Sequence, residues 1–440
     1  MERLLKECNN SKNIVIIGNG VAGITCARNI RKKSHSKITV ISSETEHHFS
    51  RTALMYIYMG HMRYQDTKPY EDSFWKKNRI ELLNRFVTKV ESDKKILHFS
   101  NGENLKYDIL VLALGSVPNK FGWPGQDLKG VQSLYSYQNL ELMEKNTKDA
   151  KHAVVVGGGL IGVEMVEMLK SRNISVSFLV REKNFWDSVL PIEEASLIEK
   201  HILEHHIDLK LNTELKEIIG DKNGRVESII TSTGEKIDCQ FVGLTVGVSP
   251  NISLVKDTEI TTDRGILIND YFETNIKDIY AIGDCAQFSI SIKGRRPIEQ
   301  VWYTGRMHGE TLAHSIATCE KTAYQPGHWF NSAKFFDIEY QTYGNVPYQM
   351  PENFNSFYWE HPTEKICLRL VFEKETEKFI GLNVFGIRMR HAVVDKWLNE
   401  MQSVNYVIDN LQEANFDPEF FIKHESAIIL SYKYKTVKSN

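Results

Sequence analysis

The sequence has few cysteines, and none of them stands close to another. No Cys-x-x-Cys pair occurs, and no cysteine spacing fits a zinc or iron–sulfur motif. These absences exclude the common cysteine-based metal and cluster sites, and we expect reduced, mostly buried thiols. The six cysteines are Cys8, Cys26, Cys239, Cys285, Cys319 and Cys367.

Long apolar runs and an excess of one charge are also missing. The most apolar stretches, such as Ile109–Leu114, have the length of a strand and fall well short of the ~18 residues of a membrane-spanning helix. Met1–Lys12 is charged and polar, so we expect no signal peptide and a cytoplasmic protein. The 54 basic and 56 acidic residues give a formal net charge of -2, which argues against nucleic acid or an anionic membrane as partner.

Two glycine-rich motifs stand out among what is present. Each follows an apolar stretch of strand length and opens a helical pattern, in a chain whose 440 residues predict two or three domains. A pyrophosphate binds where the free N–H groups of a helix N-terminus point, and glycine lets the backbone come close to it. The pair therefore predicts two dinucleotide sites. The glycines are Gly18, Gly20 and Gly23 in the first motif and Gly157, Gly159 and Gly162 in the second.

The first motif lies in a predicted βαβ unit. Its parts are a strand over Ile14–Ile17, a helix over Gly20–Lys33 and a strand over Lys37–Ile41. The crossover connection places Glu44 beside an adenine ribose. Ile109–Leu114 is typical of a buried parallel strand that returns to the same sheet.

A second βαβ unit begins at Ala153, with a helix over Leu160–Lys170 and a strand over Ser175–Val180. Alternation over Glu214–Thr245 then predicts a β-meander with tight turns. Further predicted elements are a strand from Asp278 to Ile282, a helix from Gln300 to Ala317, aromatic-rich alternating segments at Ala333–Tyr340, Phe354–Trp359 and Leu368–Phe372, and helices at Val393–Met401 and Val404–Ala414.

With these residues the chain resembles the FAD- and NAD(P)-dependent pyridine nucleotide oxidoreductase family, flavoproteins with two dinucleotide-binding domains. The order and spacing fit over about residues 12–320, and the segment from Ile38 to Arg51 is especially similar to the flavin domain of nitrite reductase. Rubredoxin reductases, ferredoxin reductases and NADH oxidases are similar as well. The resemblance implies an α/β fold with two Rossmann-like domains, for FAD and NAD(P), and a C-terminal α+β domain.

The domain boundaries follow from this resemblance. The implied FAD-binding domain is discontinuous and combines residues 1–122 and 248–323, while residues 123–247 form the NAD(P)-binding domain. The C-terminal domain, residues 324–440, serves in the family for homodimer contacts or for covering the flavin.

In the family the first glycine motif holds FAD. The resemblance implies that Arg51 bridges phosphate oxygens, that the backbone of Val87 contacts adenine, that Asp284 binds the ribityl chain and that Trp302 lies near the flavin ring. The helix that begins near Gln300 points its positive end at that ring. The full set of implied FAD residues is Gly18, Gly20, Gly23, Glu44, Arg51, Val87, Ala113, Gly115, Gly283, Asp284 and Trp302.

The second motif is implied to hold the nicotinamide dinucleotide. Glu164 matches an acid that lies close to flavin and nicotinamide in relatives, and it is our candidate catalytic residue. An NADH enzyme usually has a carboxylate after the second strand, but this chain has Arg181, which could accept a 2′-phosphate, so NADH and NADPH both stay open. The implied NAD(P) residues are Gly157, Gly159, Gly162, Arg181 and Gly247.

Three departures from the family pattern bear on the chemistry. Residues 48–56 contain no thiol, where disulfide reductases and peroxidase-type relatives carry one, so thiolate chemistry is disfavoured. Tyr56 stands where relatives that reduce proteins often have a lysine, which leaves Glu164 without its family partner. Leu114 replaces the usual threonine between Ala113 and Gly115.

The implied function is an FAD-dependent NAD(P)H oxidoreductase that passes electrons to an external acceptor, such as rubredoxin, ferredoxin or a quinone. The alternatives are an NADH oxidase that uses dioxygen, and a non-enzymatic NAD(P)H-binding flavoprotein that acts as a sensor or interaction protein. One further motif, His201–His205, fits the H-x-x-E-H pattern of a zinc peptidase. We interpret it as a solvated helix face and expect no metal site.

Overall fold

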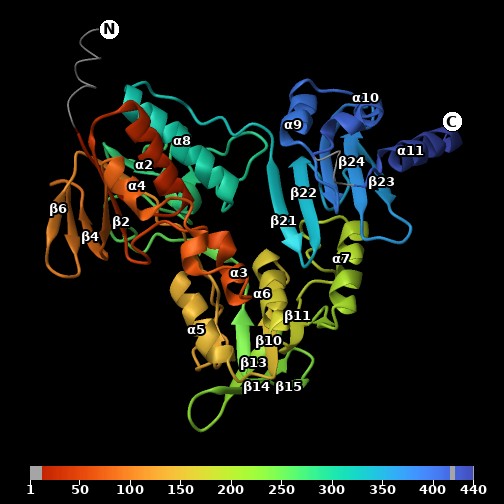
Figure 1. Cartoon of the computed structure of the whole chain (residues 1–440), viewed down its shortest axis with the longest axis horizontal. Coiled ribbons are helices and arrows are strands. Elements are labelled where there is room, and N and C mark those ends of the chain that lie inside the picture. The colour runs from red at the N-terminus through yellow and green to blue at the C-terminus, as the bar shows by residue number, and fades with distance from the viewer. Residues whose placement is uncertain (1–11, 417–421, 440) are drawn as a thin grey trace. The chain divides into compact units, whose positions relative to one another are not determined.

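Alternating apolar strands and helices build two parallel sheets, and the computed structural model describes them over residues 12–416 and 422–439 (Figure 1). Contacts divide the chain into two units, each made of three segments. Unit 1 consists of Met1–Phe121, Gln132–Lys148 and Val246–Pro326, and unit 2 of Gly122–Val131, Asp149–Thr245 and Gly327–Asn440. Residues 132–148 thus group with unit 1 and residues 327–440 with unit 2, while the three-domain division stays a prediction.

Unit 1 contains a five-stranded parallel sheet with the strand order β19-β7-β1-β2-β3. Its strands are apolar and buried because helices cover the sheet, as parallel sheets require. The first predicted βαβ unit is confirmed, with α2 as the crossover helix. The elements are β1 (Asn13–Ile17), β2 (Lys37–Ser42), β3 (Ile80–Asn84), β7 (Ile109–Leu112), β19 (Ile279–Ala281), α2 (Val21–Lys33) and α8 (Trp302–Thr318).

Helices α2 and α8 pack closely side by side in unit 1 (Figure 1). Small residues permit this approach, since a Cβ added at Gly309 would lie 2.5 Å from the carbonyl oxygen of Ala22. The other elements of unit 1 are α3 (Leu54–Tyr58), α4 (Asp72–Lys77), α5 (Tyr137–Thr147), the sheet of β4 (Val87–Glu91), β5 (Ile96–Phe99) and β6 (Asn104–Lys106), and the pairs β8 (Ser116–Pro118) with β17 (Val248–Pro250) and β18 (Ile266–Ile268) with β20 (Ala286–Phe288).

Unit 2 contains a second five-stranded sheet, of order β12-β11-β10-β16-β9, in which β12, β11, β10 and β16 run parallel. The predicted helix and strand of the second βαβ unit are confirmed as α6 and β11. The predicted meander over Glu214–Thr245 is right for the sheet β13-β14-β15 but wrong for its last strand, because β16 pairs in parallel with β10. The elements are β9 (Val131–Gln132), β10 (His152–Val156), α6 (Leu160–Ser171), β11 (Ser175–Leu179), α7 (Ile192–Glu204), β12 (Asp208–Lys210), β13 (Leu215–Gly220), β14 (Val226–Thr231), β15 (Lys236–Asp238) and β16 (Phe241–Leu244).

The C-terminal part of unit 2 is an antiparallel sheet of order β21-β22-β25-β24-β23, with helices packed on its apolar face. The predicted segment Ala333–Tyr340 is wrong as one strand, because the chain turns at Phe336 and Asp337 to form a hairpin. The predicted helix Val404–Ala414 breaks at Asn410. The elements are β21 (Phe330–Phe335), β22 (Ile338–Gly344), β23 (Phe354–Glu360), β24 (Cys367–Glu373), β25 (Phe379–Phe385), α9 (His391–Asn399), α10 (Val404–Asp409) and α11 (Glu425–Ser439).

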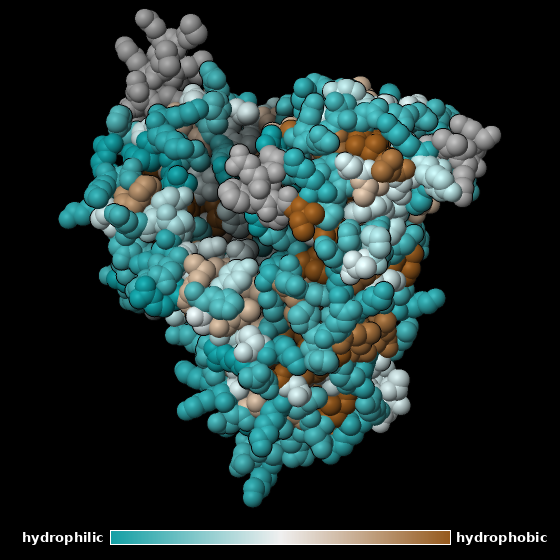
Figure 2. All heavy atoms as spheres, turned by 45° about the vertical axis from the view of Figure 1, so that its right-hand side comes forward, coloured by the Kyte–Doolittle hydropathy of each residue, from teal (hydrophilic) through white to brown (hydrophobic). Residues whose placement is uncertain are grey.

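Two expectations from composition concern the state of the cysteines and the lack of a membrane-spanning helix. Cys26, Cys239, Cys285 and Cys367 are buried free thiols. Cys319 is disulfide-bonded, so the expectation of reduced thiols is wrong for it, and Cys8 lies outside the described residues. No helix of the described residues combines the length and apolarity needed to cross a bilayer. Figure 2 shows a face on which hydrophilic side chains prevail over small groups of hydrophobic ones.

Candidate functional site

Four sequence-predicted segments meet at one edge of the unit 1 sheet. The strands β1, β2, β7 and β19 run parallel, so their carboxyl ends lie side by side. The segments that leave these ends carry the first glycine motif, Glu44, the Ala113–Gly115 turn and the Gly283–Asp284 turn. The carboxyl edge of an open parallel sheet is where such folds bind ligands. Unit 1 therefore brings together residues that are up to 266 positions apart.

The three glycines of the first motif differ in their geometric surroundings. Gly18 has a φ of +114°, and a Cβ there would lie 2.0 Å from the carbonyl oxygen of Ala113. A Cβ at Gly23 would lie 2.0 Å from the carbonyl oxygen of Gly18, so helix and turn need hydrogen at this position. At Gly20, the N-cap of α2, a Cβ would meet no described atom within 4 Å. The space above Gly20 and the uncapped helix N-terminus suit a phosphate group.

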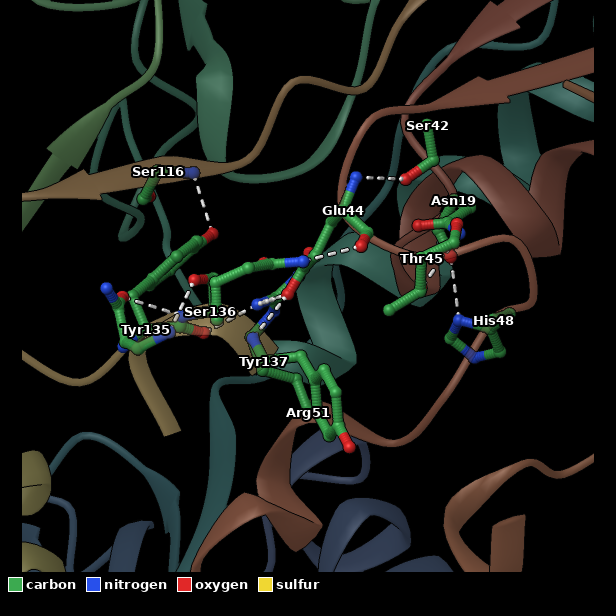
Figure 3. A network of polar contacts seen from close by, with 12 residues as sticks. Asn19, Ser42, Glu44, Thr45, His48, Arg51, Ser116, Tyr135, Ser136 and Tyr137 are labelled. Carbon is green, nitrogen blue, oxygen red and sulfur yellow. Dashed lines mark hydrogen bonds and ion pairs between the residues drawn. The ribbon is translucent and has the colours of Figure 1, made fainter. Parts of the chain in front are cut away.

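Glu44 and Arg51 form an ion pair at this edge (Figure 3). Arg51 donates from Nη1 and Nη2 to the two carboxylate oxygens of Glu44, at 2.9 and 2.5 Å, and also to the carbonyl oxygen of Tyr135. The backbone N–H of Tyr137 donates to Oε1 of Glu44 at 2.9 Å. A carboxylate offers about four lone-pair sites, and these three donors leave capacity on Oε2 for a ribose hydroxyl.

Asp284 lies at the same edge and belongs to a network of hydrogen bonds that the sequence analysis did not predict. Its Oδ2 accepts a hydrogen bond from Ser116 Oγ at 3.1 Å, and Ser116 Oγ accepts one from Gln300 at 2.7 Å. Burial raises the pKa of Asp284, and the Ser116 hydrogen bond and Arg51 oppose this rise. The backbone N–H of Ser116 donates to the hydroxyl of Tyr135, whose pKa burial raises to about 12 (Figure 3).

His308 on α8 supports the Gly283 turn from below. The backbone N–H of Gly283, whose φ is +72°, donates to Nδ1 of His308 at 3.1 Å. Burial lowers the pKa of His308 to about 3, so its ring stays neutral and keeps this lone pair. Val87 begins β4 two residues after Arg85, whose N–H donates to the carbonyl oxygen of Ser42 at the end of β2.

Trp302 and Gly115 occupy different surroundings in unit 1. Trp302 is the first residue of α8 and 42% exposed, with Tyr303 edge-on at 5.3 Å between ring centroids. Gly115 has a φ of +69°, and a Cβ there would lie 2.8 Å from the hydroxyl of Tyr135. The Tyr135 hydroxyl thus lies against this turn as well as against Ser116. No signal in the sequence around Tyr135 pointed to such a role.

The second glycine motif repeats the geometry of the first within unit 2. Gly157 has a φ of +113°, and a Cβ at Gly162 would lie 2.1 Å from the carbonyl oxygen of Gly157. Gly159 is the N-cap of α6, and a Cβ added there would have no atom of the described residues within 4 Å. Thr245 donates its hydroxyl to the carbonyl oxygens of Val156 and Gly157, which holds the turn on β16. This second turn also suits a pyrophosphate.

The other implied nucleotide residues belong to different elements of the chain. Arg181 follows β11, is 70% exposed and pairs with Glu182. Glu164 lies on α6, where burial and the neighbouring carboxylate of Glu167 raise its pKa to about 7, with an opposing effect of Lys334. Gly247 belongs to unit 1, where it precedes β17 and its carbonyl oxygen accepts from the N–H of Asn119.

The H-x-x-E-H motif on α7 differs from the expected solvated helix face. His201 is only 6% exposed and packs against the β21–β22 turn, so that interpretation is wrong for this residue. The two other residues of the motif, Glu204 and His205, are more exposed. Burial of one histidine on an otherwise charged helix end was not visible from the helical pattern.

Comparison with known families places residues 12–309 within one family model, described as pyridine nucleotide-disulphide oxidoreductase. Among curated proteins, the nitrite reductase [NAD(P)H] of Bacillus subtilis is 31% identical over 279 residues, which cover 63% of this chain and 34% of that protein. The chain thus matches about a third of that relative's length. The NADH-rubredoxin oxidoreductase of Clostridium acetobutylicum is also 31% identical, over 63% of this chain and 69% of its own.

A solved structure supports the fold over almost the whole chain. The NAD-dependent persulfide reductase from A. fulgidus aligns with a TM-score of 0.84 and 23% sequence identity, and the alignment covers 97% of this chain and 83% of that chain. The fold class predicted from sequence, α/β with two Rossmann-like domains and a C-terminal α+β domain, is confirmed.

Proposed function

Since the chain belongs to the pyridine nucleotide-disulphide oxidoreductase family, we propose that it is an FAD-dependent NAD(P)H oxidoreductase that reduces an external electron acceptor. The observation that carries this proposal is the meeting of four predicted segments at the carboxyl edge of the unit 1 sheet. When bound, FAD would accept a hydride from the nicotinamide and release electrons singly or in pairs. The residues of the chain supply binding, orientation and charge.

The residues at the unit 1 edge fit a flavin dinucleotide. The open space at Gly20 and the uncapped N-terminus of α2 accept the pyrophosphate, while Glu44 holds the ribose and Arg51 neutralises phosphate charge. Asp284 keeps carboxylate oxygens in a buried position, where hydrogen bonds from a ribityl chain would offset the cost of burial. The backbone at Val87 serves the adenine, and Trp302 borders the ring.

The second glycine turn fits the nicotinamide dinucleotide for the same reasons. Gly159 leaves room for the pyrophosphate, and Arg181 lies exposed at the end of β11, where it is able to pair with a 2′-phosphate after releasing Glu182. Glu164, with a pKa raised to about 7, is positioned to hold or release a proton at neutral pH. Gly247 is assigned to the nicotinamide from the family resemblance.

The acceptor is proposed to be a small redox protein of the rubredoxin or ferredoxin type. The four cysteines that are free thiols are all buried, and burial raises the pKa of Cys285 to about 12, so these residues offer no exposed thiolate for disulfide chemistry. We therefore propose that electrons pass to a molecule from outside and not to one of these four thiols. A cytoplasmic location and a homodimer through the C-terminal domain stay predictions.

An anaerobic stopped-flow experiment tests the reductase function directly. The purified protein, reconstituted with FAD, is mixed with NADH and, separately, with NADPH while the flavin absorbance is followed. Rapid bleaching with at least one nucleotide is expected. Failure to bind FAD would overturn the proposal, and reduction that takes minutes would favour the sensor function instead.

A second experiment tests the acceptor. Oxygen consumption with NAD(P)H is compared with and without added rubredoxin or ferredoxin, whose own reduction is followed optically. We expect slow oxygen consumption and reduction of at least one of these proteins. Fast oxygen consumption alone, with no reduction of either protein, would identify an NADH oxidase instead.

A further inference from the structure

Two histidines and one aspartate lie close together in unit 2, and none of them belongs to either glycine motif. His201 lies in the last turn of α7 and His205 is its C-cap, so the two side chains share one helix face. Asp337 comes from the two-residue turn between β21 and β22, 136 positions later in the chain. These are the ligand types that bind zinc and its neighbours among the transition metals.

The distances among the three donor atoms fit one small cation. Nε2 of His201 lies 2.6 Å from Oδ1 of Asp337 and 3.3 Å from Nε2 of His205, and Nε2 of His205 lies 3.7 Å from Oδ1 of Asp337. For a triangle with these sides, a point about 2.1 Å from all three atoms exists just above its plane, which is the usual bond length of zinc to nitrogen and oxygen.

Hydrogen bonds alone cannot pair all the donor and acceptor atoms of this cluster. A hydrogen on Nε2 of His201 points either to Asp337 or to His205, so one of the two short contacts stays without a hydrogen. Nδ1 of His201 is buried and has no partner among the described residues, so the ring hydrogen is free to sit there. In that tautomer both the Nε2 lone pair of His201 and the carboxylate of Asp337 face the same point.

One aromatic side chain fixes both imidazoles. Phe336 stacks on the His205 ring, with 4.3 Å between centroids and 9° between planes, and meets the His201 ring edge-on at 5.7 Å. Phe336 precedes Asp337 in the same turn, so the carboxylate and the wall behind the imidazoles come from adjacent residues. Rings held in this way lose little conformational freedom on binding an ion.

The remaining residue of the motif argues against peptidase chemistry. In an H-x-x-E-H peptidase the glutamate acts as general base beside the metal. Here the Glu204 carboxylate pairs with Lys365 on the neighbouring segment, which lowers the pKa of Glu204. Asp337 is 78% exposed, so a bound ion would keep a position open to solvent. The arrangement suits an ion that joins two elements.

We propose that His201, His205 and Asp337 bind one divalent transition-metal ion of the zinc type, which joins the end of α7 to the β21–β22 turn. The two Nε2 atoms and one carboxylate oxygen are the protein ligands, and water completes the coordination. Hard cations such as Mg²⁺ are excluded by the two imidazoles, because they favour oxygen ligands.

Metal binding by the full-length protein tests this proposal. The protein is treated with a chelator, dialysed, and titrated with ZnCl₂ in equilibrium dialysis and with CoCl₂ by absorbance, in the presence of excess Mg²⁺. We expect about one zinc ion per chain and visible Co²⁺ bands that zinc abolishes. No zinc binding by the native protein at micromolar concentrations would overturn the proposal.

Matched variants locate the ion. His205→Gln and Asp337→Asn should each weaken zinc binding at least about tenfold, whereas His206→Gln, an exposed neighbour outside the cluster, should leave it unchanged. Both ligand positions are partly or largely exposed, and thermal unfolding without metal checks that each variant folds. Zinc should raise the melting temperature of the native protein but not of the two ligand variants. Equal zinc binding by all three variants would place the ion elsewhere and refute the assignment.

Discussion

Glu44 and Arg51 meet in a two-pronged ion pair at the carboxyl edge of the unit 1 sheet, with Oε1 and Oε2 each facing one guanidinium nitrogen. Both side chains are largely buried, at 18% and 33% exposure, so the pair is held in place before any ligand arrives. Arg51 also lies over the ring of Tyr135 at 4.6 Å. The ribose ligand and the phosphate ligand proposed for FAD therefore position each other.

Glu44→Ala should damage both flavin binding and stability. Arg51 would lose its partner in a largely buried position, which costs about 1–3 kcal/mol of unfolding free energy, and the FAD dissociation constant should rise about tenfold or more. Fluorescence titration with FAD and urea unfolding measure the two effects. Glu46→Ala, at an exposed neighbouring position, is the control and should change neither. Equal FAD affinity in both variants would remove Glu44 from the site.

Substitutions at the glycines of the first motif should separate binding from folding. Gly20→Val places a side chain where no described atom lies within 4 Å, so the apoprotein should fold while FAD binding is lost. Gly23→Ala drives a Cβ against the carbonyl oxygen of Gly18 and should lower stability by about 2–4 kcal/mol. Flavin content and thermal unfolding are measured on both proteins. A yellow, fully loaded Gly20→Val protein would contradict the assignment.

The same contrast should hold at the second motif. Gly159→Val should keep the fold and the bound FAD but abolish reduction by NAD(P)H, since its Cβ also meets no described atom. Gly162→Ala should instead unfold at lower temperature, because its Cβ lies 2.1 Å from the carbonyl oxygen of Gly157. Anaerobic reduction rates and melting temperatures distinguish the two variants. Normal reduction of Gly159→Val by NADH and NADPH would refute the nucleotide site.

Buried His308 should make the protein sensitive to acid. Burial lowers its pKa to about 3 in the folded state, against about 6.5 in the unfolded chain, so the unfolded state takes up a proton first as the pH falls. The stabilising contribution is present above about pH 6.5 and is lost progressively down to pH 3, by up to roughly 4 kcal/mol. Urea unfolding at several pH values measures this slope. His308→Asn keeps an acceptor for Gly283 and should show a shallower slope; an unchanged slope would exclude His308 as its source.

The nucleotide preference should depend on the Arg181–Glu182 pair. Arg181→Gln should lower kcat/KM for NADPH relative to NADH, because a 2′-phosphate loses its cation. Glu182→Gln should release Arg181 and raise the NADPH ratio by at most about fivefold, since an exposed ion pair is worth less than about 1 kcal/mol. Steady-state kinetics with both nucleotides supply the ratios. If neither variant changes the ratio of kcat/KM for NADPH to that for NADH, Arg181 does not bind the 2′-phosphate.

Local pattern predicted the parts of this fold that depend on neighbours in sequence. The strand, turn and helix at Gly18 and at Gly157 are fixed by apolar runs and by glycines whose Cβ would clash. Both βαβ units were therefore predictable. The hairpin turn at Phe336 was missed because aromatic alternation continues through it without glycine, asparagine or proline. Phe336 instead accepts a φ of 56°.

Long-range partners explain what the sequence could not supply. Ser116, Tyr135 and His308 join the unit 1 site through contacts with residues far away in the chain, and no motif marks them. Asp337 likewise contacts His201 from 136 positions away, through the turn between β21 and β22. Pattern reading therefore found the backbone turns of the site and missed the polar side chains that support them.

The order of segments in unit 1 has a consequence for synthesis on the ribosome. Strand β7 is made early, but its neighbour β19 and the helix α8 that packs on α2 are made more than 160 residues later. Until then β7 is an edge strand with open hydrogen-bonding groups, and Asp284 does not yet exist beside the glycine turn. The nascent chain must keep this incomplete sheet protected while the parallel sheet of unit 2 is made. The site proposed for the flavin is complete only when residues up to Pro326 have emerged.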